Sequence, residues 1–463
     1  MTSAAAQIPG KSFFLVDCQP ANVQAATPQP SLKQLAIRGA VWTVAGYGAS
    51  QLLRLGGNLV LTRLLFPEAF GLMALVGVFM QGLAMFSDVG IGPAIIQSRR
   101  GEDPDFLNTA WTIQIIRGFV LWLISCLIAW PVAVLYGEPM LVQLLPVAGM
   151  TAAIRGFQTT AVSTASRRLC LGNLTLVQLL EQSIGITAML IWSVVHPSVW
   201  ALAGSGVISS FVSVLLQFRF LPGHGHRISL EADALRHLLR FGKWIFVSTV
   251  MSFLIAQADR LVVAHLSNTR TLGLFAIAAT LCSVPLTLAL QLSANVVFAG
   301  LSRSRIDAGR GVVRERSRKF CLAAFSALLP IILLLFAASD RIVSILYDQR
   351  YAEAAPLLRL LCIGAVGTIV TNLSGAPLLA LGDSRSQAIL QIVRGGLFLS
   401  ATGIGVGSNS LEVFLVALAI ARCVEYLPAA VMLRRAGVWN PGVDVSFLGG
   451  YLAAMACFWA SQR

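Results

Sequence analysis

The chain has 463 residues, of which 56% are hydrophobic and only 12% are charged. A soluble domain of this length needs far more charge on its surface, so the composition excludes a soluble fold. The formal net charge of +14 does not indicate a nucleic-acid partner, because the basic residues follow the positive-inside rule of membrane proteins.

The first 35 residues are rich in Ala, Gln and Pro, and their one apolar run is Phe13–Val16. That run is too short for the core of a signal peptide, so residues 1–35 are predicted to form a disordered cytoplasmic tail. The eight cysteines are scattered singly, without metal-ligand spacing, and no disulfide framework is predicted.

From about residue 38 onward, apolar stretches of 18 or more residues recur between short polar connections. Each is long enough to cross a hydrocarbon core of roughly 30 Å as a helix. We predict an all-α polytopic membrane protein with twelve spans, at about 38–65, 70–97, 107–136, 140–163, 173–195, 199–221, 243–266, 271–299, 318–338, 355–380, 386–407 and 411–434. A thirteenth apolar stretch, at about 445–461, is barely long enough to span, and its crossing stays open.

The connections after the even-numbered spans carry most of the basic residues, which are Arg99, Arg100, Arg167, Arg168, Arg227, Arg236, Arg240, Arg303 through Lys319, Arg385, Arg434 and Arg435. The intervening connections hold little beyond Arg270, Arg341 and Arg350. This asymmetry predicts that the N-terminus and the basic loops lie in the cytoplasm. We expect the protein to lie in a bacterial inner membrane, to cross it many times and to contact the membrane lipids.

The chain repeats itself after 202 residues, without a gap from the first span into the second. The shift aligns Arg38 with Arg240, Trp42 with Trp244, and Gly71-Leu72 with Gly273-Leu274. Two halves of six spans in the same orientation are typical of alternating-access transporters. We therefore predict two six-helix lobes around a central cavity, at 36–221 and 243–436, joined by a cytoplasmic linker at 222–242 and followed by an apolar segment at 437–463 that is a possible extra helix.

Several runs resemble a known family. They are LTRLLFPEAFGL at 61–72, FSDVGIGPAIIQ at 86–97, LNTAW at 107–111, QADRL at 257–261 and LGLFA at 272–276. The resemblance is to the polysaccharide transporter family, the Wzx-type oligosaccharide flippases of the multidrug/oligosaccharidyl-lipid/polysaccharide (MOP) superfamily. It implies a substrate of undecaprenyl-pyrophosphate-linked sugars, moved to the periplasmic leaflet for lipopolysaccharide or exopolysaccharide synthesis. It also implies a polysaccharide polymerase and glycosyltransferases as partners. Members usually have an even number of spans, so the thirteenth stretch is a departure.

Independently of the family, arginines within apolar spans indicate a binding cavity. Arg54 and Arg422 lie mid-span, whereas Arg117, Arg155, Arg260 and Arg394 lie nearer one face. A buried charge costs roughly 2.5–3.5 kcal/mol at the bilayer centre unless it meets a partner or a wet cavity. Because the guanidinium donates paired hydrogen bonds to phosphate oxygens, these six arginines are candidates for binding a pyrophosphate. The alternatives are that Arg117 and Arg394 extend to the interface, and that Arg422 and Glu425 neutralise each other.

The acidic residues within spans are Asp88, Glu181, Asp259 and Glu425. They are either sites for a coupling proton or sodium ion, or partners in interhelical salt bridges, and the sequence leaves both open. The Gly90–Pro93 run predicts a bend in the second span, because proline removes a helix hydrogen bond.

Apart from a coupling proton or sodium ion, no cofactor or metal is predicted. The sequence contains no P-loop, GxSxG or HExxH motif that would indicate an enzyme. A glycan polymerase, ligase or glycosyltransferase would need a large extracytoplasmic loop or an acidic catalytic motif. The remaining alternative is an ion-coupled multidrug or small-molecule exporter of related architecture, which would favour acids over arginines in its cavity.

Overall fold

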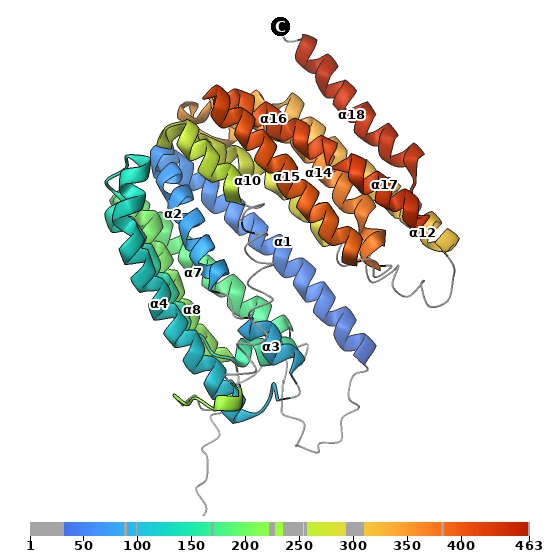
Figure 1. Cartoon of the computed structure of the whole chain (residues 1–463). Helices are drawn as coiled ribbons and strands as arrows, with labels where there is room; N and C mark the ends of the chain where they lie inside the picture. Colours follow the sequence, from blue (N-terminus) through green and yellow to red (C-terminus); the bar gives the residue numbers. More distant parts are fainter. Residues whose placement is uncertain are drawn as a thin grey trace, which may run out of the picture. The chain divides into compact units, whose positions relative to one another are not determined.

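The computed structural model describes residues 32–87, 90–98, 100–167, 171–221, 227–234, 253, 257–292, 310–380 and 384–461 (Figure 1). Throughout these ranges the regular structure is helical. Ten of the described helices are long and apolar enough to cross a membrane. This confirms the prediction of an all-α, multi-span membrane protein. Asp88, the 300–309 loop and most of the predicted span 243–266 lie outside the described residues.

The first part of the chain forms α1 (Leu32–Leu64), α2 (Pro67–Phe86), α3 (Ile91–Gln97), α4 (Pro104–Tyr136), α5 (Leu141–Gly156), α6 (Ala161–Arg167), α7 (Leu171–Val195) and α8 (Val199–Phe220). The later part forms α10 (Thr269–Leu292), α12 (Arg310–Ala337), α13 (Ser339–Leu346), the 3₁₀ turn η2 (Gln349–Tyr351), α14 (Ala354–Ala380), α15 (Ser384–Ser408), α16 (Leu411–Val424), α17 (Tyr426–Ala436) and α18 (Pro441–Ser461).

Several predicted spans are interrupted. The span predicted at 70–97 is divided into α2 and α3, and Gly90, which precedes α3, adopts a left-handed conformation with φ 64°. This conformation suits glycine, which has no Cβ. The break predicted at Gly90–Pro93 is thus confirmed, but its cause is not a lost hydrogen bond. Pro93 lies in the first turn of α3, where its missing N–H costs no helix bond. The 140–163 span is likewise divided into α5 and α6, and the 411–434 span into α16 and α17.

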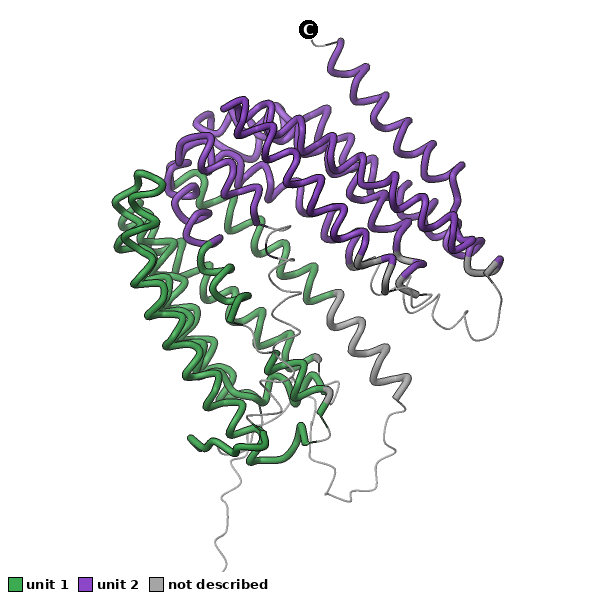
Figure 2. The backbone as a smooth tube through the Cα atoms, viewed as in Figure 1, with its two compact units in different colours: residues 1–64, 79–250 green, residues 65–78, 251–463 purple. Residues whose placement is uncertain are grey.

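The chain divides into two compact units, which Figure 2 shows in different colours. One unit comprises residues 1–64 and 79–250, and the other comprises residues 65–78 and 251–463. The division falls inside α2, because its first half packs with the later helices. The Tyr351 hydroxyl, for example, donates a hydrogen bond of 2.8 Å to the carbonyl oxygen of Leu65. The boundaries predicted for the two lobes stay a prediction.

In the first unit, α4 and α5 pack closely through small residues. A Cβ on Gly118 would lie 2.6 Å from the carbonyl oxygen of Ala152, and a Cβ on Gly149 would lie 1.9 Å from Ser125 Oγ. Such close approach of backbones is how helices associate in lipid, where no hydrophobic effect draws them together. α7 contacts both α1 and α8, and Gln182 of α7 donates a hydrogen bond of 2.9 Å to the Ser50 carbonyl oxygen.

In the second unit, α14 is the central helix and contacts α10, α12, α15, α16, α17 and α18. Apart from Arg359 near its start and a few polar residues such as Asn372 and Ser374, its sequence is apolar, which is typical of a helix buried on most sides. The core side chains that it contributes include Leu358, Ile369, Val370 and Leu373. The thirteenth apolar stretch is one continuous helix, α18, of 21 residues.

Candidate functional site

Most of the charged residues predicted within spans lie in polar networks, and each network is contained within a single unit. In the first unit, the Arg155 guanidinium of α5 lies 3.7 Å from the Glu181 carboxylate of α7. Ser213 of α8 donates a hydrogen bond of 2.7 Å to Glu181, and Arg155 donates one of 3.3 Å to Ser210. Glu181 is mostly buried, whereas the Arg155 side chain is 55% exposed and retains donors for another anion.

The second unit contains two further ion pairs. Arg394 of α15 donates a hydrogen bond of 3.0 Å to Glu425 and one of 3.3 Å to Asn372 of α14. Arg422 of α16 lies 3.6 Å from the Asp259 carboxylate. Arg422 and Glu425 therefore each form an ion pair with a different segment, and between themselves they have an electrostatic interaction without an ion-pair contact among the described ones. The neighbouring Arg260 donates to Gln257 at 2.8 Å.

Arg117 of α4 contacts the end of α2. Its Nε donates to Ser87 Oγ at 2.8 Å, and its Nη2 donates to the Ala84 carbonyl oxygen at 2.6 Å. The last carbonyl groups of a helix have no partners within the helix, and a cation is favourable at that end of the helix dipole. In these contacts Arg117 acts as a cap for α2.

Arg54 differs from the other five candidate arginines. It lies on α1, its side chain is exposed, and it has no hydrogen bond or ion pair with any residue that the structure describes. Its charge is thus available to a ligand. Asp88, the fourth acidic candidate, cannot be placed, because it lies outside the described residues.

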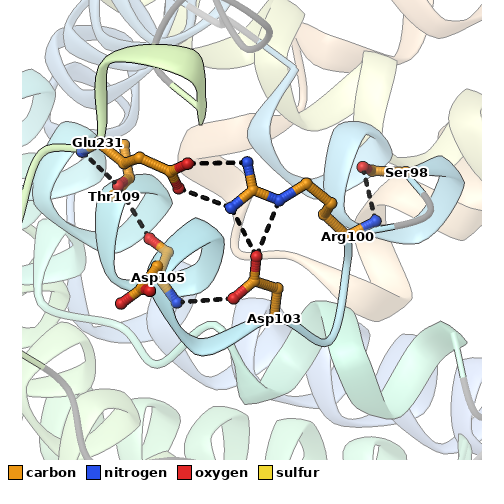
Figure 3. Close-up of polar contacts among 6 residues, drawn as sticks. All are labelled: Ser98, Arg100, Asp103, Asp105, Thr109 and Glu231. Atoms are coloured by element: carbon orange, nitrogen blue, oxygen red, sulfur yellow. Dashed lines mark hydrogen bonds and ion pairs between the residues drawn. The ribbon is translucent and has the colours of Figure 1, made fainter.

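A polar cluster that the sequence did not predict binds part of the linker to the first unit (Figure 3). Residues 227–234, which we call the linker strap, lie against the start of α4. Arg100 donates to the two carboxylate oxygens of Glu231, at 2.9 and 2.7 Å, and to Asp103 at 2.8 Å. Arg100 also holds the pKa of the Asp103 carboxyl below its ordinary value, because it donates hydrogen bonds to the ionised form.

The LNTAW run, which carries part of the family resemblance, holds the backbone of the linker strap. Asn108 Oδ1 accepts a hydrogen bond of 3.0 Å from the Arg227 amide, and Thr109 Oγ1 accepts one of 3.0 Å from the Glu231 amide. Beside them, Thr112 accepts a bond of 3.1 Å from the Ser229 amide. These polar side chains therefore anchor a connection, a role that only the contact with a distant segment could reveal.

An apolar groove of about 540 Å³ runs between α15 and α16. It is lined by Leu397, Ser400, Ala401, Ile404, Glu412, Val413, Val416, Ala417, Ile420, Ala421 and Val424. Among the residues that the structure describes, none of the six candidate arginines lines this groove. The groove is therefore not suited to a phosphate group.

Comparison with known proteins gives a consistent result. Residues 60–356 match a family model described as "Polysaccharide biosynthesis protein". The curated relatives include "Succinoglycan biosynthesis transport protein ExoT" of Rhizobium meliloti (strain 1021), which is 21% identical over 66% of this chain and 61% of the relative. The match thus spans about three fifths of that relative. "Lipopolysaccharide biosynthesis protein WzxC" of Escherichia coli (strain K12) is 21% identical over 81% of this chain and 76% of the relative.

A third relative is "Teichuronic acid biosynthesis protein TuaB" of Bacillus subtilis (strain 168), 19% identical over 64% of this chain and 61% of the relative. Among solved structures, "Lipid II flippase MurJ, inward closed conformation" has a TM-score of 0.68, 14% identity, and covers 92% of this chain and 93% of that one. An inward-facing multidrug resistance MATE family transporter of the MOP superfamily has a TM-score of 0.65, 15% identity, and covers 84% and 94%. At this identity, both structures establish the shared fold.

Proposed function

Because this chain belongs to the polysaccharide biosynthesis protein family, we propose that it flips an undecaprenyl-pyrophosphate-linked oligosaccharide from the cytoplasmic to the periplasmic leaflet of a bacterial inner membrane. The observation that carries the proposal is the family match over residues 60–356 in a chain with ten apolar helices of membrane-spanning length. A polysaccharide polymerase and glycosyltransferases would be its partners in the same pathway.

The relatives support the substrate class. Their names refer to the biosynthesis of succinoglycan, lipopolysaccharide and teichuronic acid, three different glycans. Related transporters in pathways for different glycans would recognise a part of the precursor that does not depend on the sugar. A lipid-linked pyrophosphate would be such a part. The recognition would then depend on cations rather than on contacts to one particular sugar.

In the proposed mechanism, an arginine-lined cavity opens alternately to each side of the membrane. Arg54 is the foremost candidate for the pyrophosphate, because its exposed guanidinium has no partner among the described residues. Arg422 would contribute only after exchanging the Asp259 carboxylate, 3.6 Å away, for the substrate. An exchange of this kind lets the site bind a doubly charged group and then release it.

The test uses the full chain in proteoliposomes with a fluorescent lipid-linked oligosaccharide, whose flipping exposes the label to an impermeant quencher. We expect Arg54→Ala to slow flipping by roughly tenfold or more, the cost of losing a charge-assisted hydrogen-bond pair. Arg54→Lys should restore part of the rate, because the charge remains while the two-pronged geometry is lost. Arg219→Ala, which removes a cation near the end of α8, is the matched control.

Arg422→Ala needs a second variant, because it also leaves Asp259 without its cation. The double variant Arg422→Ala/Asp259→Asn removes the pair without leaving a buried charge, so its flipping rate reports on the substrate role of Arg422. Unchanged flipping in both the Arg54 and the double variant would refute the arginine-lined cavity. No flipping by the unmodified chain would refute the substrate class.

The alternative is an ion-coupled exporter of drugs or other small molecules, which the fold of the MATE transporter favours. This function predicts efflux of small organic cations by the reconstituted chain and no movement of the lipid-linked oligosaccharide. The same proteoliposomes distinguish the two functions when each substrate is supplied in turn.

A further inference from the structure

Asp444 is a buried carboxyl group that none of the preceding functions uses. It lies in the first turn of α18 and is 2% exposed. Its side chain contacts two other helices of the second unit. Ser374 of α14 donates a hydrogen bond of 2.8 Å to Oδ1, and Tyr426 of α17 donates one of 3.0 Å to Oδ2. This carboxyl therefore links α18 to the rest of the unit.

The surroundings of Asp444 differ from those of the acids singled out in the sequence. Glu181, Asp259 and Glu425 each lie within an ion pair with an arginine. Asp444 has neutral donors only, and no ion pair with a cation among the residues that the structure describes. A buried carboxylate without a counter-charge is unfavourable, whereas the neutral acid is not. Its environment therefore favours the uptake of a cation, and a proton is the smallest one.

The direction of the hydrogen bonds shows which oxygen could take the proton. Trp439 Nε1 donates to the Tyr426 hydroxyl oxygen at 3.0 Å, and an indole N–H can only donate. The Tyr426 hydrogen is therefore committed to Oδ2 of Asp444. The Ser374 hydroxyl has no such constraint, because a serine within a helix can turn its hydrogen to the carbonyl oxygen four residues earlier, here that of Val370.

We propose that Asp444 is a proton-binding site that takes up and releases its proton at Oδ1. On uptake, the new O–H of Asp444 donates to Ser374 Oγ, and the Ser374 hydrogen turns to the Val370 carbonyl oxygen. The Tyr426 bond is unchanged, so the network gains a proton and loses no hydrogen bond. The proton comes from water and returns to it, and no covalent bond between heavy atoms changes.

The other titratable and charged groups around this site are few. Tyr426 is the phenol already described, and Cys321 of α12 is a buried thiol that interacts electrostatically with Asp444. Arg314 of α12 is bound to Asn440, which precedes α18, with Nε donating to Oδ1 at 3.3 Å. α14 contributes the neutral Ser374. Asp444 is thus the one carboxyl group that these described contacts bring into the network.

The test is infrared difference spectroscopy of the purified full chain in lipid, as the pH is stepped between about 4 and 9. We expect a carboxylic-acid carbonyl band that grows as the pH falls and is missing in Asp444→Asn. Glu412→Gln, which removes an exposed carboxyl near the start of α16, should keep the band. Asp444→Asn should fold, because its amide can donate to Ser374 and accept from Tyr426, as the protonated acid would.

A second variant keeps the carboxyl and tests the same site. Tyr426→Phe removes the donor to Oδ2 and so destabilises the ionised form, which should move the midpoint of the band to higher pH. The proposal is overturned by identical difference spectra in the unmodified chain and Asp444→Asn, or by an Asp444 band that is constant at every pH. A band that instead responds to sodium at fixed pH would overturn the assignment to a proton. None of these outcomes depends on which substrate the chain transports.

Discussion

Gly71 of α2 and Gly273 of α10 lie in a reciprocal contact. A Cβ on Gly71 would lie 1.8 Å from the carbonyl oxygen of Thr269, four residues before Gly273, and a Cβ on Gly273 would lie 1.9 Å from that of Pro67, four residues before Gly71. Both pairs are 202 residues apart in the sequence. Residues in contact that exchange roles in this way indicate a local two-fold relationship between the two helix starts. Equivalent positions of the two sequence repeats are therefore in contact with each other here.

This contact predicts that either glycine is sensitive to a single methyl group. Gly71→Ala and Gly273→Ala should each lower the free energy of unfolding by about 1–3 kcal/mol, because the methyl group would overlap a backbone carbonyl that cannot turn aside. Gly77→Ala, on the same helix α2 and with open space at its Cβ, should be neutral or slightly stabilising. Thermal unfolding in detergent measures all three, and equal midpoints for Gly71→Ala and Gly77→Ala would contradict the contact.

Arg100 should determine how firmly the linker strap is held. Arg100→Gln removes the paired bonds to Glu231, so the amides of Arg227, Ser229 and Glu231 should exchange with deuterium faster than in the unmodified chain. Arg227→Gln removes a cation from the same strap without removing a side-chain contact that the structure describes, and it is the control. Equal exchange in the two variants would show that the backbone bonds alone hold the strap.

The strap should also respond to acid. Since the pKa of Asp103 is lowered from its ordinary value of 3.8, its bond with Arg100 stabilises the strap above that pH and is lost as the pH falls through the lowered pKa. The expected result is a strap that stays ordered at about pH 5 and loosens only below about pH 4. A nitroxide label on Leu230→Cys, in a background without other cysteines, measures this by its mobility. In Arg100→Gln the label should already be mobile at neutral pH.

The pair Arg394–Glu425 tests whether an acid within a span is structural or couples transport to an ion. Glu425→Ala should lower the free energy of unfolding by roughly 3–5 kcal/mol, because it leaves the Arg394 charge without its carboxylate. The exchange Arg394→Glu/Glu425→Arg should restore much of the loss. Thermal unfolding and the amount of membrane-inserted protein measure both. A Glu425→Gln variant with normal stability but no transport would instead favour an ion-coupling role.

Features that depend on local sequence were predictable. Long apolar runs predicted the helices, because a backbone in lipid must satisfy its own hydrogen bonds. Gly90 and Pro93 predicted the break between α2 and α3, because their backbone preferences act within a few residues. The repeat was also visible in the sequence. Gly71 and Gly273 are each in close contact with a backbone carbonyl of the other helix, so both positions require glycine.

What the tertiary structure decided is the partner of each polar group. A charge within an apolar run shows that a partner is needed, but the partner depends on how each helix is rotated and on what packs beside it. Arg117 contacts the end of α2, 30 residues earlier at Ser87, and Glu425 forms its ion pair with Arg394, which lies on another helix. The sequence did not predict a site at Asp444, because Ser374 and Tyr426 lie on other helices, and only the packed fold places them beside it.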